Sequence, residues 1–222
     1  SVVPPFLRPS GTALLEVLNR AQYGKPSVTF RQADIVSQIG NYIQYLGWQF
    51  ARDWGNVGSR AAMALFTLLG LTGAAALWQR DRRAFWASTT LIVTLTLALV
   101  FYLNFKYGFS YPVPPEKGQV LREVRERDYF FVVSFGALGL WVAVGMGALM
   151  QSVAEMLRGR ASQRTAYLMA TPILLLALIP AFGNRVTASR ANETLARDFA
   201  RDMLESVEPY GILVTAGDND TF

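Results

Sequence analysis

The sequence has 222 residues, of which 52% are hydrophobic and only 17% are charged, with a net charge of +5. This composition is more apolar than that of most water-soluble domains. The absence of cysteine and histidine excludes disulfides, thiolate metal sites, histidine-ligated pigments and Ser-His-Asp triads within this chain. The positive charge does not indicate nucleic-acid binding, because most arginines lie in short loops or at the ends of apolar segments, as expected for a membrane protein.

Residues 1–59 are predicted to form an N-terminal segment with one amphipathic helix at 35–51. Six apolar side chains recur there at helical spacing: Ile35, Ile39, Tyr42, Ile43, Leu46 and Phe50. Polar side chains, including Asn41, fall on another face of that helix. The pattern favours an interfacial helix that packs against protein over a helix immersed in lipid.

Four long stretches without charged residues follow and predict four membrane-spanning helices. The stretches 61–79, 84–105, 129–154 and 165–184 contain 19, 22, 26 and 20 residues. A helix needs about 20 apolar residues to cross a hydrocarbon layer about 30 Å thick, and a backbone in lipid must satisfy its own hydrogen bonds. We therefore predict an α-helical integral membrane protein whose transmembrane region, 60–183, contains helices at 61–78, 84–103, 129–150 and 166–182.

Two details of these spans concern packing. Gly139, Ala143 and Gly147 recur every four residues in the third span, and small residues at this spacing let another helix approach closely. We predict a helix-packing role for them. In the fourth span, Pro172 and Pro180 predict a kink.

The arginines of the short loops predict the orientation. "QRDRR" separates the first two spans, and residues 151–164 between the last two add three more arginines. Basic loops of this kind stay in the cytoplasm. The N-terminal segment, the loop 104–128 and the tail are therefore expected to face outward, which in a bacterial inner (cytoplasmic) membrane means the periplasm or the exterior.

The tail, 184–222, is predicted to begin an outward-facing α/β domain. "ANETLARDFARDMLESV" has one apolar stripe, as in an amphipathic helix, and "GILVTA" resembles a short buried strand. Asp218 and Asp220 follow that strand. Carboxylates suit Mg²⁺ or Mn²⁺, so this pair could contact a sugar or a divalent cation, although Gly-Asp-Asn-Asp is also favourable turn chemistry. Both interpretations stay open, and no firm metal site is assigned.

A charged segment, "REVRERDYFF", enters the third span and is expected to be helical. It could be a solvated helix face with the pairs Arg122–Glu126 and Glu123–Arg127. Alternatively, Arg125 and Arg127 could bind a carrier phosphate, because guanidinium groups fit phosphate oxygens in a bidentate manner. Arg185, after the fourth span, has the same two interpretations: interfacial anchor or phosphate ligand.

Three stretches together resemble a known family: "NRAQYGKPSV", "VRERDYFF" and the tail that ends in "GDNDTF". They are similar to a large bacterial family of multi-pass membrane proteins of unknown function, related to the transmembrane protein O-mannosyltransferases. The resemblance implies a C-type glycosyltransferase-like fold and sugar transfer from a polyprenyl-phosphate lipid on the outer face. That family continues on both sides of this sequence, so the chain is expected to be a fragment.

Two functional hypotheses therefore remain. The chain could be the membrane portion of a glycosyltransferase-like protein that depends on a polyprenyl-phosphate sugar. Alternatively, it could be a non-enzymatic structural subunit that packs against other membrane subunits. No catalytic residue is assigned, and enzymatic activity is left undecided. Both hypotheses have the lipid bilayer as a partner and neither involves nucleic acid.

Overall fold

The computed structural model describes Leu15 and residues 28–214, which divide between two compact units, Ser1–Asn184 and Arg185–Phe222. In this described part, helices and turns account for the fold, and no β-strand is present apart from an isolated bridge between Tyr107 and Arg122. Four helical segments of the first unit are long and apolar enough to cross a membrane. This confirms the predicted helical architecture with four candidate spans.

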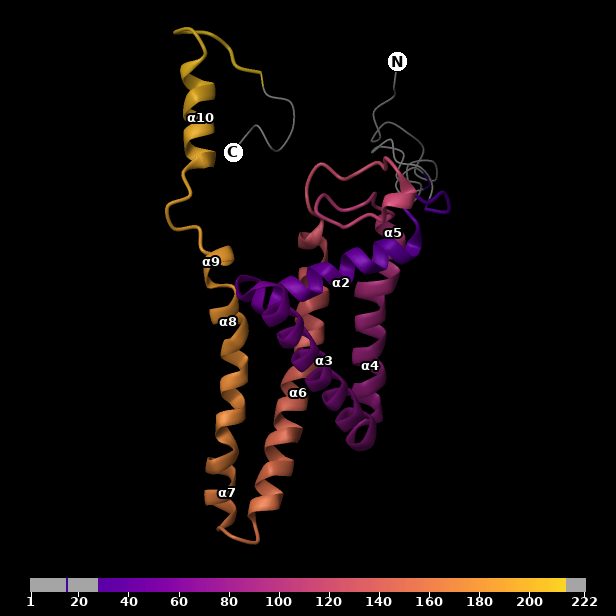
Figure 1. The fold of residues 1–222 in the computed structure, drawn as a ribbon, viewed down its shortest axis with the longest axis vertical. Coiled ribbons are helices and arrows are strands. Elements are labelled where there is room, and N and C mark those ends of the chain that lie inside the picture. Colours follow the sequence, from indigo (N-terminus) through magenta and orange to yellow (C-terminus); the bar gives the residue numbers. More distant parts are fainter. Residues whose placement is uncertain (1–14, 16–27, 215–222) are drawn as a thin grey trace. The chain divides into compact units, whose positions relative to one another are not determined.

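The four segments follow one another along the chain and are labelled in Figure 1. The first, Ile35–Arg80, comprises α2 (Ile35–Ala51), a 3₁₀ turn (Arg52–Trp54) and α3 (Gly55–Arg80). The second is α4 (Arg82–Val93), continued by a π-helical turn (Thr94–Ala98) and α5 (Leu99–Leu103). The third is a 3₁₀ turn (Asp128–Phe131) followed by α6 (Val132–Leu157), and the fourth is α7 (Gln163–Ala170), a 3₁₀ stretch (Thr171–Leu178) and α8 (Ile179–Gly183). The last segment changes its hydrogen-bonding pattern after Pro172, which removes a backbone donor. Proline therefore makes this span irregular.

The helix α2 (Ile35–Ala51) covers the same residues as the predicted amphipathic helix. The Asp34 carboxylate caps its N-terminus by accepting a 2.8 Å hydrogen bond from the Ser37 N–H. A 3₁₀ turn then separates α2 from α3, whose first residue, Gly55, has a φ of 69° that favours glycine. Figure 1 shows α2 running across the long helices instead of along them.

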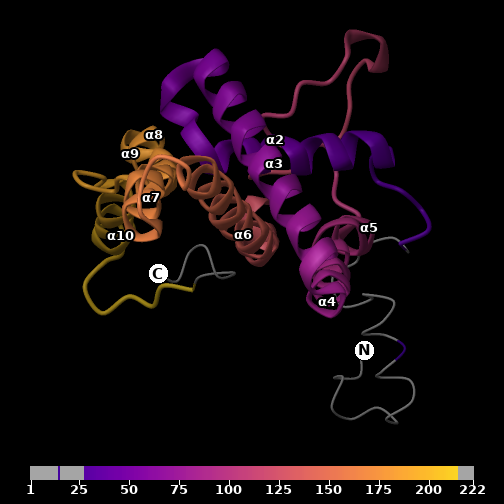
Figure 2. The ribbon, with the colours of Figure 1, turned by 90° about the horizontal axis from the view of Figure 1, so that it is seen from below.

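The closest helix pair in the first unit is α3 with α6, which lie side by side in Figures 1 and 2. Gly73 and Gly145 form the crossing. A Cβ added to Gly73 would overlap the carbonyl of Trp141, and one added to Gly145 would overlap the carbonyl of Leu69. Two backbones can approach this closely only where both helices present glycine.

The loop at residues 104–127 packs on α2. The predicted helix over its second half is wrong, because residues 119–127 are extended or in turns and helical structure resumes only at Asp128. Below the loop, aromatic and aliphatic side chains from α2, α5 and the start of α6 form a core. Its buried members are Tyr42, Tyr45, Val100, Leu103, Phe105 and Phe131.

The second unit contains α9 (Arg185–Ala188) and α10 (Leu195–Glu205). The amphipathic helix predicted in the tail is therefore present. The strand predicted in "GILVTA" is not present over residues 211–214, and its last two residues lie outside the described part. The described part of the tail accordingly does not support an α/β unit, since only its helix is there.

Candidate functional site

The loop 104–127 buries the polar face of α2. Ser37, Gln38 and Asn41 are at most 7% exposed, whereas the apolar Ile35 and Ile43 are 40% and 46% exposed. The Gln38 side chain donates a 2.5 Å hydrogen bond to the Phe105 carbonyl and accepts one from Arg31. α2 therefore packs on protein as predicted, and its polar face takes part in this packing.

Tyr45 connects the centre of α2 to the far end of the loop. Its hydroxyl donates a 2.7 Å hydrogen bond to Glu126 and accepts one of 3.1 Å from the Arg127 N–H. The other Glu126 oxygen accepts a 2.8 Å hydrogen bond from the Ser110 N–H. One carboxylate thus fixes α2 and both arms of the loop together.

Asn104 shapes the beginning of the loop. It is fully buried and lies in the left-handed region with φ of 43°, which asparagine tolerates better than most residues. Its side chain accepts a hydrogen bond of 3.1 Å from the Gln32 N–H and donates one of 2.9 Å to the Phe30 carbonyl. Asn104 therefore ends α5 and anchors the segment that precedes α2.

Asp34, Lys117 and Tyr107 form a second polar connection at the start of α2. The Lys117 ammonium lies 2.5 Å from the Asp34 carboxylate, which also accepts a 2.8 Å hydrogen bond from the Tyr107 hydroxyl. Burial alone would raise the pKa of Asp34, but the hydrogen bonds from Lys117, Ser37 and Tyr107 outweigh it and hold that pKa well below its usual range. The same contact with Asp34 raises the pKa of Lys117.

The two arginines predicted to bind a phosphate lie next to each other at the entrance to α6. Arg127 forms a 2.6 Å ion pair with the buried Glu123, which confirms the predicted Glu123–Arg127 pair. Arg125 is exposed, with its guanidinium 5.4 Å from the centre of the Tyr129 ring. Both arginines also donate to the Tyr129 hydroxyl, at 3.2 and 3.5 Å. Burial would lower the pKa of Arg127, but its hydrogen bonds to Glu123 and Tyr129 raise it.

The second predicted pair, Arg122 with Glu126, is not the arrangement in the structure. The guanidinium of Arg122 donates hydrogen bonds of 2.9, 3.0 and 2.9 Å to the carbonyls of Gly108, Phe109 and Tyr111. The Arg122 side chain therefore points across the loop to residues 108–111 and not toward Glu126. It holds the turn at 108–111 in place.

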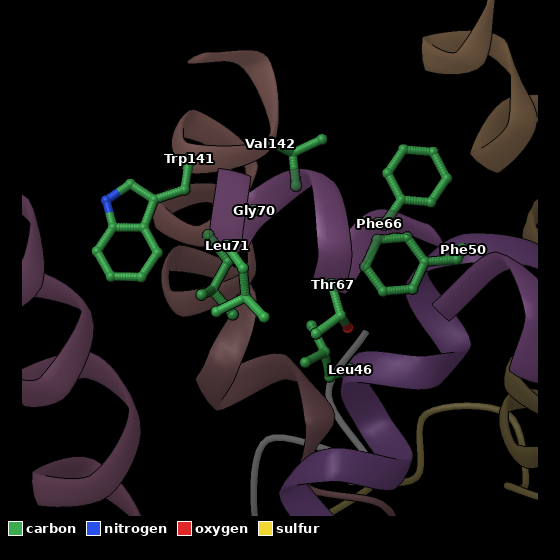
Figure 3. Close-up of a pocket in the computed structure, with 9 residues that line it drawn as sticks. Leu46, Phe50, Phe66, Thr67, Gly70, Leu71, Trp141 and Val142 are labelled. Atoms are coloured by element: carbon green, nitrogen blue, oxygen red, sulfur yellow. The ribbon is translucent and has the colours of Figure 1, made fainter. Parts of the chain in front are cut away.

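An apolar cavity of about 130 Å³ lies where α2, α3 and α6 meet (Figure 3). Leu46 and Phe50 of α2, Phe66 and Thr67 of α3, and Trp141 of α6 are among its walls. The rings of Phe50 and Phe66 stack at 4.8 Å. Its lining is almost entirely hydrocarbon, so it suits a hydrocarbon chain and not a polar ligand.

The remaining predicted site residues lie in the tail and in α6. Arg185 is the first residue of α9 in the second unit, and Asp218 and Asp220 lie outside the described residues. Gly139, Ala143 and Gly147 lie on the exposed side of α6, and a Cβ added to either glycine would meet no atom within 4 Å. Packing within this chain uses Gly145 instead, so a packing role for the predicted three requires another helix and stays a prediction.

Comparison with known proteins identifies no relative. No family model matches the chain, and neither a curated protein nor a solved structure matches it. Within residues 28–214, no three His, Cys, Asp or Glu side chains are grouped so that they could hold a metal ion.

Sequence reasoning missed the residues that organise this end of the first unit. No sequence motif marks Asn104, Asp34 or Lys117, because each has a hydrogen-bond partner more than 70 positions away in the chain. The only signal was the amide-rich face of α2, which a soluble or lipid-facing helix would not need. That face could have predicted a polar covering segment.

Proposed function

We propose that this chain is the membrane portion of a glycosyltransferase-like protein that uses a polyprenyl-phosphate sugar at the outer face of a bacterial inner membrane. The observation that supports it best is the pairing of two environments in the first unit. Arg125 and Arg127 meet at the hydroxyl of Tyr129 at the entrance to α6, and α6 also lines the apolar cavity. A lipid phosphate needs both a cationic surface for its head and a hydrocarbon environment for its chain.

Within this proposal Arg125 is the better phosphate ligand of the two. Arg127 is largely committed to Glu123, and removing it would leave a carboxylate that is 8% exposed without its cation. Arg125 is exposed, so its guanidinium can be reached by a ligand from outside the protein.

The test is binding of a polyprenyl-phosphate sugar to the purified chain in lipid nanodiscs. Arg125→Ala is expected to weaken binding about 10-fold, the usual effect of removing one charge-assisted contact. Arg158→Ala is the matched control, because Arg158 is an exposed arginine at the other end of α6. If the Arg125→Ala variant and the Arg127→Lys variant both bind as wild type does, the two arginines are not phosphate ligands and this part of the proposal is refuted.

The distant residues require a separate test. In the proposal, Arg185 adds to the binding of the carrier phosphate, and Asp218 and Asp220 contact the sugar or a divalent cation. Transfer activity of the native protein should fall in an Asp218→Asn/Asp220→Asn variant, and added Mn²⁺ should not restore it. Full activity in that variant would remove the acidic pair from the proposal.

A second candidate is a structural subunit of a larger membrane assembly. The exposed stripe of Gly139, Ala143 and Gly147, with open space at both glycines, favours it. A neighbouring helix seated there would be displaced by Gly139→Leu or Gly147→Leu, which co-purification in mild detergent would reveal. A native polypeptide close to 24.6 kDa would favour this candidate, and one several times larger would favour the enzyme.

A further inference from the structure

A second cavity, of about 470 Å³, lies beside α2, next to its buried polar face, since the lining residue Gln44 is hydrogen-bonded to Asn41. Its walls come from α2, the first turns of α3 and the tip of the loop. The polar and aromatic residues among them are Gln44, Trp48, Asn56, Ser59, Arg60 and Tyr111. This volume falls in the range of small-molecule sites, about 300–1,000 Å³.

The lining has one charge, Arg60, and no acidic side chain. The Arg60 side chain is exposed and forms no ion pair or hydrogen bond with any residue in the described part of the chain. Ser59 and Arg60 follow Asn56 by three and four positions in α3, so each lies next to Asn56 on the helix surface, and all three line the cavity. Together they offer donors to one anion.

The position of Arg60 along α3 fixes the depth of this cavity. Arg60 is the last charged residue before the uncharged stretch 61–79, so it marks the boundary between polar and apolar surroundings. Trp48, an aromatic side chain of the type found at membrane interfaces, lies in the same cavity. An anion held here would sit at the depth of lipid headgroups.

The wall of the cavity that Tyr111 forms is held in place by specific contacts. Arg122 holds the carbonyl of Tyr111 at 2.9 Å, and the Tyr111 ring lies so close to Gly40 that an added Cβ would overlap its hydroxyl. An arginine that merely anchors a helix at the interface needs no such wall. Glycine at position 40 is what allows Tyr111 to close the cavity.

We propose that this cavity binds the phosphate group of a membrane lipid, with Arg60, Asn56 and Ser59 as the phosphate ligands. The inference deepens the proposed function by adding a headgroup site, although it does not require that the lipid be a polyprenyl carrier. Guanidinium, amide and hydroxyl donors match phosphate oxygens. Apolar side chains in the same lining, among them Met63, would contact the adjoining hydrocarbon.

The experiment measures lipids retained by the full chain in native mass spectrometry after release from nanodiscs. The nanodiscs are formed from a galactolipid, which lacks phosphate, with added phosphatidic acid, undecaprenyl phosphate or diacylglycerol, the last of which also lacks phosphate. Wild-type protein is expected to retain one phosphate-bearing lipid and not diacylglycerol. Arg60→Gln should lower that retention about 10- to 100-fold, Arg60→Lys should lower it less, and Arg158→Gln should leave it unchanged.

A second variant and a stability measurement distinguish loss of the site from loss of the fold. Gly40→Ala displaces Tyr111 and should also weaken retention, while the melting temperature of each variant shows that the fold is intact. Retention by Arg60→Gln equal to wild type, or no preference for phosphate-bearing lipids, would overturn the inference. Equally strong competition by millimolar inorganic phosphate would overturn the assignment to a lipid.

Failure of the inference and failure of the proposed function can be told apart. Retention of phosphatidic acid alone, dependent on Arg60, supports the site and contradicts a polyprenyl-phosphate function. Retention of undecaprenyl phosphate that does not depend on Arg60 supports the function and contradicts the site.

Discussion

Substituting Gly145 by alanine should separate α3 from α6. The added Cβ would lie 2.8 Å from the carbonyl carbon of Leu69, and ordinary contact begins at 3.4 Å. The helices must therefore move apart by about 0.6 Å at this point, and more to clear the carbonyl oxygen. Overpacking of this kind costs about 1–3 kcal/mol.

The matched controls are Gly139→Ala and Gly147→Ala on the same helix, where an added Cβ meets nothing within 4 Å. Glycine-to-alanine changes favour the helix by up to about 1 kcal/mol. Because all three variants share this gain, the difference between Gly145→Ala and its controls measures the clash alone.

Reversible unfolding in mixed micelles, followed by helical circular dichroism as the SDS fraction rises, gives the required free energies. Gly145→Ala should be less stable than either control by about 1–3 kcal/mol. If it unfolds at the same SDS fraction as Gly147→Ala, close backbone contact is not what joins α3 to α6.

Three further predictions concern the loop 104–127. Because the folded-state pKa of Asp34 is below the value of about 3.9 for an unfolded chain, the stabilisation from its pairing with Lys117 is complete at neutral pH and is lost as pH falls below about 4. The protection factors for hydrogen exchange in the loop should fall over that range in wild type but not in Asp34→Asn. Glu123→Gln leaves the guanidinium of Arg127 without its carboxylate and should lower the free energy of unfolding by about 1–3 kcal/mol, measured by thermal unfolding. The double variant Glu123→Gln/Arg127→Gln should recover part of this stability. If the losses of the two single variants simply add in the double variant, the pairing is contradicted. Asn104→Ala should lower the free energy of unfolding by about 2–4 kcal/mol, because alanine tolerates the left-handed backbone poorly and two hydrogen bonds are lost. Asn104→Gly loses the same hydrogen bonds but tolerates this backbone, so it should lose less stability. Equal losses in the two variants would show that the backbone conformation is not responsible.

The four long helices could be predicted from the sequence because each depends only on local composition. An uncharged run such as 129–154 specifies a helix whatever surrounds it, since lipid leaves the backbone no other way to satisfy its hydrogen bonds. The separate α2 was predictable for a similar reason, because its apolar periodicity is contained in 17 residues.

The candidate site was less predictable, because its contacts are long-range. The segment at 119–127 has charges spaced as in a helix, yet Arg122 and Glu126 satisfy the carbonyls and the N–H of residues 108–111, so an extended path prevails. Similarly, the spacing of Gly139, Ala143 and Gly147 indicated a packing face, but periodicity cannot say which partner a face meets. Gly145 meets α3 only because Gly73 lies opposite.

The contacts that hold α2 also set an order of assembly during synthesis. The Tyr45 hydroxyl bonds to Glu126, which is made 81 residues later, and the Gln49 carbonyl accepts a 2.8 Å hydrogen bond from Asn184, made 135 residues later. At about 5–20 residues per second, a ribosome needs roughly 7–27 seconds to add those 135 residues. During that time the C-terminal end of α2 lacks the Asn184 contact, so its complete docking is a late step that waits for the fourth span.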